Sequence, residues 1–398
     1  MAGPVPATCV SAYTPDAGLW RIAHGVRYNE GRTSDGPAEK AISGVPPGQK
    51  DLGRHSRTAE NTGMKTALTR RTVLAGAAGA TIIVKRGRAA DYKFSQYHNQ
   101  TTAGPLHRNI VAMWDAIRNE TNGRVEATVF PENNTLAAGD PAALKLLISG
   151  EIQFFTLMGG IIGTVVPVAE AQQVPFAFKS SPEAHKAIDG ALGTYVGEEM
   201  AAKGMYLFPV AGFDNGMRQV TTVVRPVVKP DDLAGVKIRV PPGQMIFDTF
   251  QAFGAEPVTT PANLIYDAIK TGRVGAQENP LVVLDGFKIY EVVKYVSMTN
   301  HSWSGFNQMA HLPTWKSLPD DIKAVITRNV TKFVRQQRDE QGKLNASLRD
   351  TFAARGLVFN EVDQARFRAR LSGVYASWKE KLGTKCWGLL EAQVGKLG

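Results

Sequence analysis

The chain has 398 residues, 43% of them hydrophobic and 21% charged, which is the composition of an ordinary globular protein long enough for two domains. The formal charge of +10 gathers at the start, because residues 1–90 carry 13 Lys and Arg against 6 Asp and Glu while the remainder carries 33 against 30, a balance that argues against a nucleic-acid partner. With only Cys9 and Cys386, the body can form neither an internal disulfide nor a cysteine zinc site.

The first 90 residues are interpreted as a leader. Residues 1–63 show no periodic apolar pattern and precede Met64, so we expect them to be untranslated or disordered, with translation starting at Met64. Arg70 and Arg71 precede a short apolar segment and then small residues, which is typical of a twin-arginine signal peptide over 64–90. A buried helix behind a chance arginine pair is the alternative.

Strands and helices alternate after the leader, which indicates an α/β fold. Apolar residues at every second position predict a strand over 91–97, and spacings of three and four predict a core-facing helix over 106–121. The glycine-rich stretch 159–163 fits no dinucleotide or phosphate-loop fingerprint and is interpreted as a plain loop, with backbone approach to a ligand as the alternative. Further strands are predicted at 125–130, 152–158 and 205–212, and helices at 140–149, 182–189 and 192–203.

The stretch 236–242 places an arginine near the end of a short strand. Apolar residues occupy every second position, so Lys237 and Arg239 share the opposite face. Pro241 and Pro242 end the strand, which puts Arg239 where a guanidinium could bind an anion. A solvated strand face is the alternative. Helices are predicted next at 245–253 and 264–271, with a strand at 256–259 between them.

A long helix is predicted near the C-terminus. The segment 317–321 has the polar cap, early proline and acidic first turn of a helix start, and Gly356 is the first strong stop. At about 1.5 Å per residue such a helix is on the order of 55 Å long, too long for one small domain. Its apolar stripe is interrupted over 335–343. This predicts a helix that is buried at both ends, exposed to solvent in the middle, and crosses between two domains.

Four segments resemble the DctP-type solute-binding receptors of tripartite ATP-independent periplasmic (TRAP) transporters, and the similarity runs from Tyr92 to the C-terminus. They are 232–241 with its K-I-R-V-P run, 254–258, 266–280 with its Q-E-N-P run, and 290–301. The resemblance implies an α/β, two-lobed periplasmic binding protein fold (type II-like) with a long C-terminal helix spanning both lobes. We assign lobe I to 91–214, lobe II to 215–304, a lobe I return strand and the long helix to 305–356, and C-terminal helices to 357–398.

The resemblance also implies a binding site. Arg239 stands at the position that pairs with the substrate carboxylate, Asn279 at one that hydrogen-bonds the same group, and Arg218 at one that supports it. A planar guanidinium can donate two parallel hydrogen bonds to a carboxylate, which Lys cannot. Asn99 matches a position that often contacts ligand from the other lobe. Two aromatic residues are added as candidates for an apolar pocket wall, with hinge or interface packing as the alternative for both: Trp303 and Phe306.

Two departures from the family pattern remove acids from this region. Gly275 and Ala276 replace an Asp-Gly pair, and Leu264 replaces a Glu. A metal-assisted binding mode is therefore not expected, and no cofactor, metal or catalytic residue is predicted.

The function predicted is a periplasmic receptor, exported through the twin-arginine route, that binds an organic acid and delivers it to the small and large membrane subunits of a TRAP permease. It would act as a monomer or homodimer. One alternative is an exported hydrolase or lyase acting on an organic acid, although the sequence has no Gly-x-Ser-x-Gly elbow and no His-Glu-x-x-His motif. Another is the same fold serving as a ligand-sensing receptor for a signalling partner.

Overall fold

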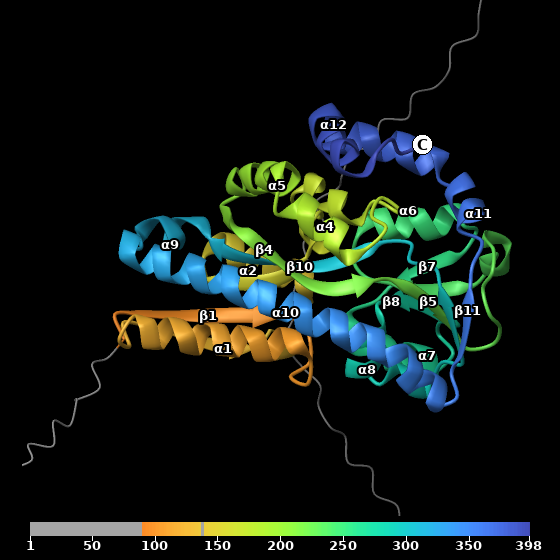
Figure 1. Ribbon diagram of the computed structural model, residues 1–398, viewed down its shortest axis with the longest axis horizontal. Coiled ribbons are helices and arrows are strands. Elements are labelled where there is room, and N and C mark those ends of the chain that lie inside the picture. Colours follow the sequence, from red (N-terminus) through yellow and green to blue (C-terminus); the bar gives the residue numbers. More distant parts are fainter. Residues whose placement is uncertain (1–89, 137–138) are drawn as a thin grey trace, which may run out of the picture. The chain divides into compact units, whose positions relative to one another are not determined.

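The computed structural model describes residues 90–136 and 139–398, which all fall in one compact unit spanning 81–398 (Figure 1). The predicted leader over 1–63, and the predicted signal peptide over 64–90 except for Ala90, lie outside the described residues. Over the described part of the chain, no helix combines the length and the apolar character needed to cross a membrane.

The first lobe is built on a five-stranded sheet. In chain order its strands are β1 (Tyr92–His98), β2 (Val125–Phe130), β3 (Phe154–Met158), β4 (Met205–Met217) and β10 (Trp303–His311). Their spatial order is β2-β1-β3-β10-β4, with β1 parallel to both of its neighbours and β10 antiparallel to both of its own. Its helices are α1 (Pro105–Glu120), α2 (Asp140–Ser149), α4 (Ser181–Ile188) and α5 (Ala191–Ala201). The segment after β3, predicted to be a loop, forms the short helix α3 (Gly159–Ile162) instead.

The second lobe holds a six-stranded sheet of the order β11-β9-β5-β8-β6-β7. In chain order these are β5 (Gln219–Thr222), β6 (Lys237–Val240), β7 (Glu256–Thr259), β8 (Ala276–Asn279), β9 (Tyr295–Met298) and β11 (Val358–Glu361). Helices α6 (Gln244–Ala252), α7 (Ile265–Lys270) and α8 (Leu281–Gly286) cover it. The prediction of helices alone over 357–398 is wrong, because β11 pairs with β9 before α11 (Gln364–Ala369) and α12 (Ser372–Val394) begin.

The chain crosses from the first sheet to the second between β4 and β5 and returns between β9 and β10. β4 was predicted to end at residue 212, yet it continues to Met217. Its polar residues Asp214 and Asn215 are buried there instead of forming a surface turn. The lobe boundaries assigned from sequence at 214/215 and 304/305 therefore fall inside β4 and β10, the two strands that lead into the crossings.

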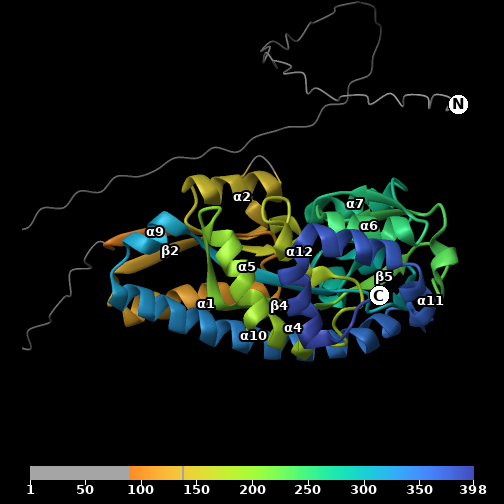
Figure 2. The same ribbon diagram turned by 90° about the horizontal axis from the view of Figure 1, so that it is seen from above.

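Helix α10 (Asp320–Ala354) runs along both lobes (Figures 1 and 2). Its first half buries apolar residues in the larger core, which contains the buried residues of the first lobe, and Leu348 and Phe352 enter a separate core in the second lobe. The prediction that the middle of this helix is exposed to solvent is wrong. Gln337 and Gln341 are buried there and donate to the carbonyls of Asp214 and Asn215 at 2.7 and 3.2 Å. The two-lobed α/β fold with a long helix spanning both lobes is confirmed.

Candidate functional site

A small cavity of about 30 Å³ lies where ends of β1 and β3 in the first lobe face ends of β6 and β8 in the second. Its lining includes five of the six residues selected from sequence: Asn99, Arg218, Arg239, Asn279 and Phe306. A larger hollow of about 580 Å³ lies along α10 and the start of α4, but it contains none of the six. Of its two cationic lining residues, Lys179 is exposed and Arg338 is already paired with Asp189 at 2.6 Å. The small cavity is therefore the candidate site.

Arg239 is buried at the wall of this cavity, with 2% of its surface exposed. Its Nε and Nη2 atoms both donate to the carbonyl oxygen of Thr260, at 2.8 and 2.5 Å. Among the described residues, no carboxylate forms an ion pair with it. Burial lowers the pKa of its guanidinium to about 9, although the charges of Glu278 and Asp140 oppose that effect and Arg218 adds to it. The solvated-face alternative holds for the exposed Lys237 but not for Arg239.

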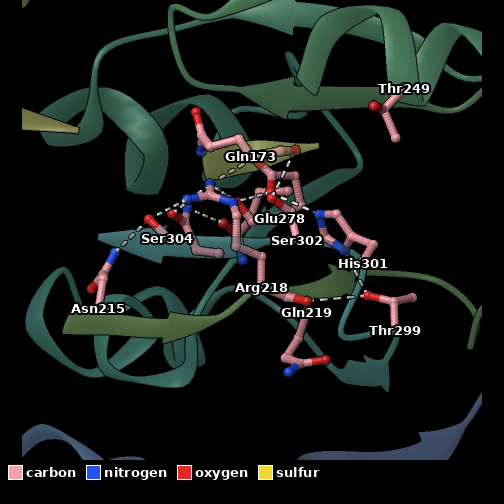
Figure 3. Close-up of polar contacts among 12 residues, drawn as sticks. Gln173, Asn215, Arg218, Gln219, Thr249, Glu278, Thr299, His301, Ser302 and Ser304 are labelled. Atoms are coloured by element: carbon pink, nitrogen blue, oxygen red, sulfur yellow. Dashed lines mark hydrogen bonds and ion pairs between the residues drawn. The ribbon is translucent and has the colours of Figure 1, made fainter. Parts of the chain in front are cut away.

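Arg218 is equally buried but fully engaged within the protein (Figure 3). Its Nε and Nη2 atoms donate to the two carboxylate oxygens of Glu278 at 2.5 and 2.7 Å. Nη2 also donates to the side-chain oxygen of Asn279 at 3.0 Å, and Nη1 donates to Ser304 at 3.1 Å. Arg218 thus fixes Asn279 at the cavity, and its own charge is neutralised inside the protein.

Glu278 and His301 complete this cluster, and sequence reasoning assigned neither a role. His301 Nε2 lies 3.1 Å from a Glu278 oxygen, and its Nδ1 lies 2.8 Å from Thr299 Oγ1 (Figure 3). Burial alone would raise the pKa of Glu278, but the charge of Arg218 and the hydrogen bond from His301 outweigh it and lower the pKa. Burial lowers the pKa of His301, against the influence of Glu278. The one sequence signal for Glu278 was its position directly before Asn279 in the Q-E-N-P run.

A second group of polar side chains lies on the first-lobe side. Asp140 accepts hydrogen bonds from Asn99 at 2.8 Å and from Asn133 at 2.6 Å. Burial raises the pKa of Asp140, opposed by these two amides and by the charge of Arg239. The side-chain oxygen of Asn133 is buried and has no hydrogen-bond partner in the described chain. Sequence reasoning treated Asp140 only as a helix start.

A second cavity, of about 240 Å³, adjoins the first and shares Asn99, Asp140 and Ala262 with it. Its lining includes Asn133 and Leu264. Together the two cavities have only Arg218 and Arg239 as cationic lining residues within the described ranges. The lining thus combines one cation that has no ion-pair partner among the described residues, Arg239, with amide and carboxylate groups.

Only one of the two aromatic candidates lines the cavity. Phe306 lines the cavity with Met158 and Val283. Trp303 lies three residues earlier on β10, so its side chain leaves the opposite face of the strand. Its indole N–H donates to Asp214 at 2.8 Å, and its ring meets His185 edge to face. The structure therefore does not bring Trp303 to the cavity, and the packing alternative fits it.

No metal site is found within 90–136 and 139–398, where no group of three or more His, Cys, Asp or Glu side chains could hold an ion.

Comparison with known proteins gives consistent matches. The sequence model of DctP, described as bacterial extracellular solute-binding protein, family 7, matches residues 94–381. The 2,3-diketo-L-gulonate-binding periplasmic protein YiaO of Escherichia coli is 27% identical over 254 residues, covering 64% of this chain and 76% of YiaO. An uncharacterized protein of Sinorhizobium fredii, y4mM, is 28% identical over 328 residues, which are 80% of this chain but only 59% of y4mM.

Among solved structures, a TRAP periplasmic solute-binding protein from Roseobacter denitrificans with bound β-D-glucuronate superposes with a TM-score of 0.72. It is 24% identical, and the superposition covers 77% of this chain and 100% of that one. At that identity the likeness supports the fold.

Proposed function

Because the chain belongs to the DctP family of bacterial extracellular solute-binding proteins, we propose that it is a periplasmic receptor that closes over one organic acid and delivers it to the membrane subunits of a TRAP transporter. The family consists of solute-binding receptors and not of enzymes, so the prediction of a non-catalytic protein is confirmed. We propose, beyond this family membership, the class of ligand, its delivery and the residues that bind it.

The contrast between the two buried arginines carries the proposal. Arg218 is paired with Glu278, whereas Arg239 meets one carbonyl oxygen and faces the cavity. A buried charge without an ion-pair partner is costly. An anion that enters the cavity would therefore pair with a guanidinium that water does not solvate. A carboxylate fits best, because its two oxygens match the planar fork of a guanidinium.

The ligand proposed is a monocarboxylic acid with several hydroxyl groups, such as a uronate. A dicarboxylate would bury a second anion, and the described lining offers no second cation without a partner, since Glu278 already neutralises Arg218. Hydroxyl groups would instead donate to Asp140 and to the unpartnered oxygen of Asn133. The glucuronate bound to the Roseobacter denitrificans protein belongs to the same chemical class.

A thermal-shift panel tests this ligand class. D-glucuronate and D-galacturonate are expected to raise the Tm, with about 4 kcal/mol of stabilisation at a thousand times Kd, and succinate is expected to raise it less. D-glucose is the matched control, since it keeps the ring and hydroxyls but lacks the carboxylate. Equal shifts with glucose and glucuronate would contradict an acid receptor, and a larger shift with succinate would contradict the hydroxy-acid class.

We also propose export through the twin-arginine route, supported by Arg70 and Arg71 before a short apolar segment. Replacing both arginines by Lys is expected to leave the precursor in the cytoplasm. Cell fractionation and the N-terminal sequence of the periplasmic form measure this, with cleavage expected near Ala90. Unchanged periplasmic yield from the double variant would exclude the route.

A further inference from the structure

Glu170 joins the two lobes at a buried contact beside the cavity. It lies in the 3-10 helix η2 (Pro167–Gln173), which packs against α3 of the first lobe. Its carboxylate accepts hydrogen bonds from the backbone N–H groups of Met245 at 2.6 Å and Gln244 at 3.3 Å, the first two residues of α6 in the second lobe. Glu170 is only 2% exposed, so the contact lies in the protein interior.

The start of α6 has no side-chain cap of its own. Its N-cap residue is Gly243, and no local side chain accepts from the first turn. The first N–H groups of a helix lack intrahelical partners, and the helix dipole favours a carboxylate at that end. Glu170 therefore supplies from the opposite lobe what a Ser or Asp N-cap would supply locally.

The backbone around this contact is shaped to admit it. A Cβ at Gly163 would lie 2.2 Å from Glu170 Cγ, so a larger residue there would displace the Glu170 side chain. A Cβ at Gly243 would lie 3.3 Å from the carbonyl oxygen of Gly160 in α3. The φ of Gly243 is 174°, which any residue adopts, so the constraint is the close approach of α3 to the start of α6.

The same contact borders the ligand cavity. Pro241 and Pro242 connect β6 to the residue that caps α6, and both line the cavity together with Arg239. Ile161 of α3 lines it from the first lobe. Because proline fixes its own φ, the segment between Arg239 and α6 is stiff, and the position of α6 is transmitted to the cavity wall.

Building on the proposed receptor function, we propose that Glu170 is a positioning residue that holds the start of α6, and with it the Pro241–Pro242 wall and Arg239, against the first lobe when the ligand is enclosed. Its state of ionisation then sets a pH dependence of ligand affinity. Glu170 touches no ligand itself and acts through α6.

Burial of Glu170, the largest influence on its pKa, fixes the direction of that dependence. Burial raises the pKa of Glu170 to about 7, although the N–H groups of Met245 and Gln244 oppose that rise. The charge of Asp248 in α6 raises the pKa further, and the charge of Lys381 in α12 lowers it. The titratable side chains on α5 and α12, which also pack against η2, include Tyr195, Glu198, Glu199, Lys385 and Cys386, and Glu198 is paired with Lys385.

Burial outweighs the two N–H groups and the helix dipole, which favour the ionised form, so closure is coupled to uptake of a proton. In this structure, where Glu170 is buried between the lobes, its pKa is about 7; separation of the lobes that lets water reach Glu170 would return the pKa toward the ordinary 4.5. A group whose pKa is higher in the closed state than in the open state stabilises the closed state fully at pH values below its open-state pKa. This stabilisation is lost as the pH rises through the closed-state pKa. Ligand affinity should fall between pH 4.5 and 7 and level off above.

Calorimetric titration of D-glucuronate between pH 5.5 and 7.5 tests the proposal, with D-galacturonate or succinate as the probe if only that acid shifts the Tm. Wild-type affinity is expected to fall by about tenfold or more over this range. Glu170→Gln imitates the protonated side chain, so its affinity should exceed that of wild type by a larger factor at pH 7.5 than at pH 5.5 and show a flatter profile. Glu170→Ala removes the acceptor and should bind more weakly than Glu170→Gln at every pH.

Two further variants separate this role from plain stability. Glu183→Gln is the matched control: Glu183 accepts the N–H of Lys179 at 2.6 Å within the first lobe, so its loss should leave the wild-type pH profile unchanged. Gly243→Ala adds a methyl group against Gly160 and should weaken binding by about tenfold, with a much smaller change in Tm.

The outcomes distinguish the two proposals. A wild-type protein that binds no acid overturns both. A protein that binds in an Arg239-dependent way, but whose pH profile is the same in wild type and Glu170→Gln, overturns the role of Glu170 alone. So does a Glu170→Gln variant that binds more weakly than wild type by the same factor at every pH, because a merely structural role predicts that result.

Discussion

An Arg239→Ala variant is expected to lose about 2–5 kcal/mol of ligand binding, or roughly thirty- to several-thousand-fold in Kd, while keeping its fold. The loss is large because the ligand carboxylate would be enclosed without a counter-charge. The fold should survive because Arg239 donates only to the carbonyl of Thr260 and forms no ion pair with any described residue. Calorimetric titration with the best acid of the panel, together with a Tm measurement, checks both parts.

Two variants calibrate this result. Arg239→Lys keeps the charge but not the fork, so its affinity should fall between those of wild type and Arg239→Ala. Lys237→Ala is the matched control, since Lys237 lies on the same strand but is exposed, and its removal should change Kd by less than about twofold. An Arg239→Ala variant with wild-type affinity would remove Arg239 from the binding site.

Local sequence signals were sufficient for many of the elements. Helix α2 was predicted over the same residues as observed, because Asp140 and Pro141 open it and Gly150 caps it in a left-handed conformation. Strand β4 was cut short, because Asp214 and Asn215 look like turn residues. They remain inside the strand because Gln337 and Gln341, more than 120 residues later, satisfy their backbone groups. Pairing over that distance leaves no local pattern.

In the candidate site, too, residues within local motifs were found and residues defined by distant contacts were missed. Arg239, Arg218 and Asn279 were found through motifs and do meet at one cavity. Asp140 and Glu170 were missed, because each acts on partners in other elements. Trp303 was predicted as a candidate for the pocket wall, but the alternation of side chains along β10 places it on the other face of the strand.

The largest effect on stability is expected from Glu278→Gln, which should lower the free energy of unfolding by about 3–5 kcal/mol. Arg218 and Glu278 are 1% and 0% exposed, so water cannot replace the lost carboxylate. The variant leaves a buried guanidinium facing a neutral amide. Denaturant unfolding at neutral pH measures the loss. Glu361→Gln breaks the exposed pair with Arg349 and serves as the control, with an expected change below about 1 kcal/mol.

Acid unfolding and a double variant test whether the charge pair itself is the cause. The pKa of Glu278 is lowered in the folded protein, so its contribution is present above the ordinary 4.5 and is lost as pH falls below that value. The difference between wild type and Glu278→Gln should therefore shrink in acid. Arg218→Met combined with Glu278→Leu removes both charges and should be more stable than either single change, because no unpaired charge stays buried. If the double variant is instead the sum of the two single losses, packing and not the ion pair accounts for the effect.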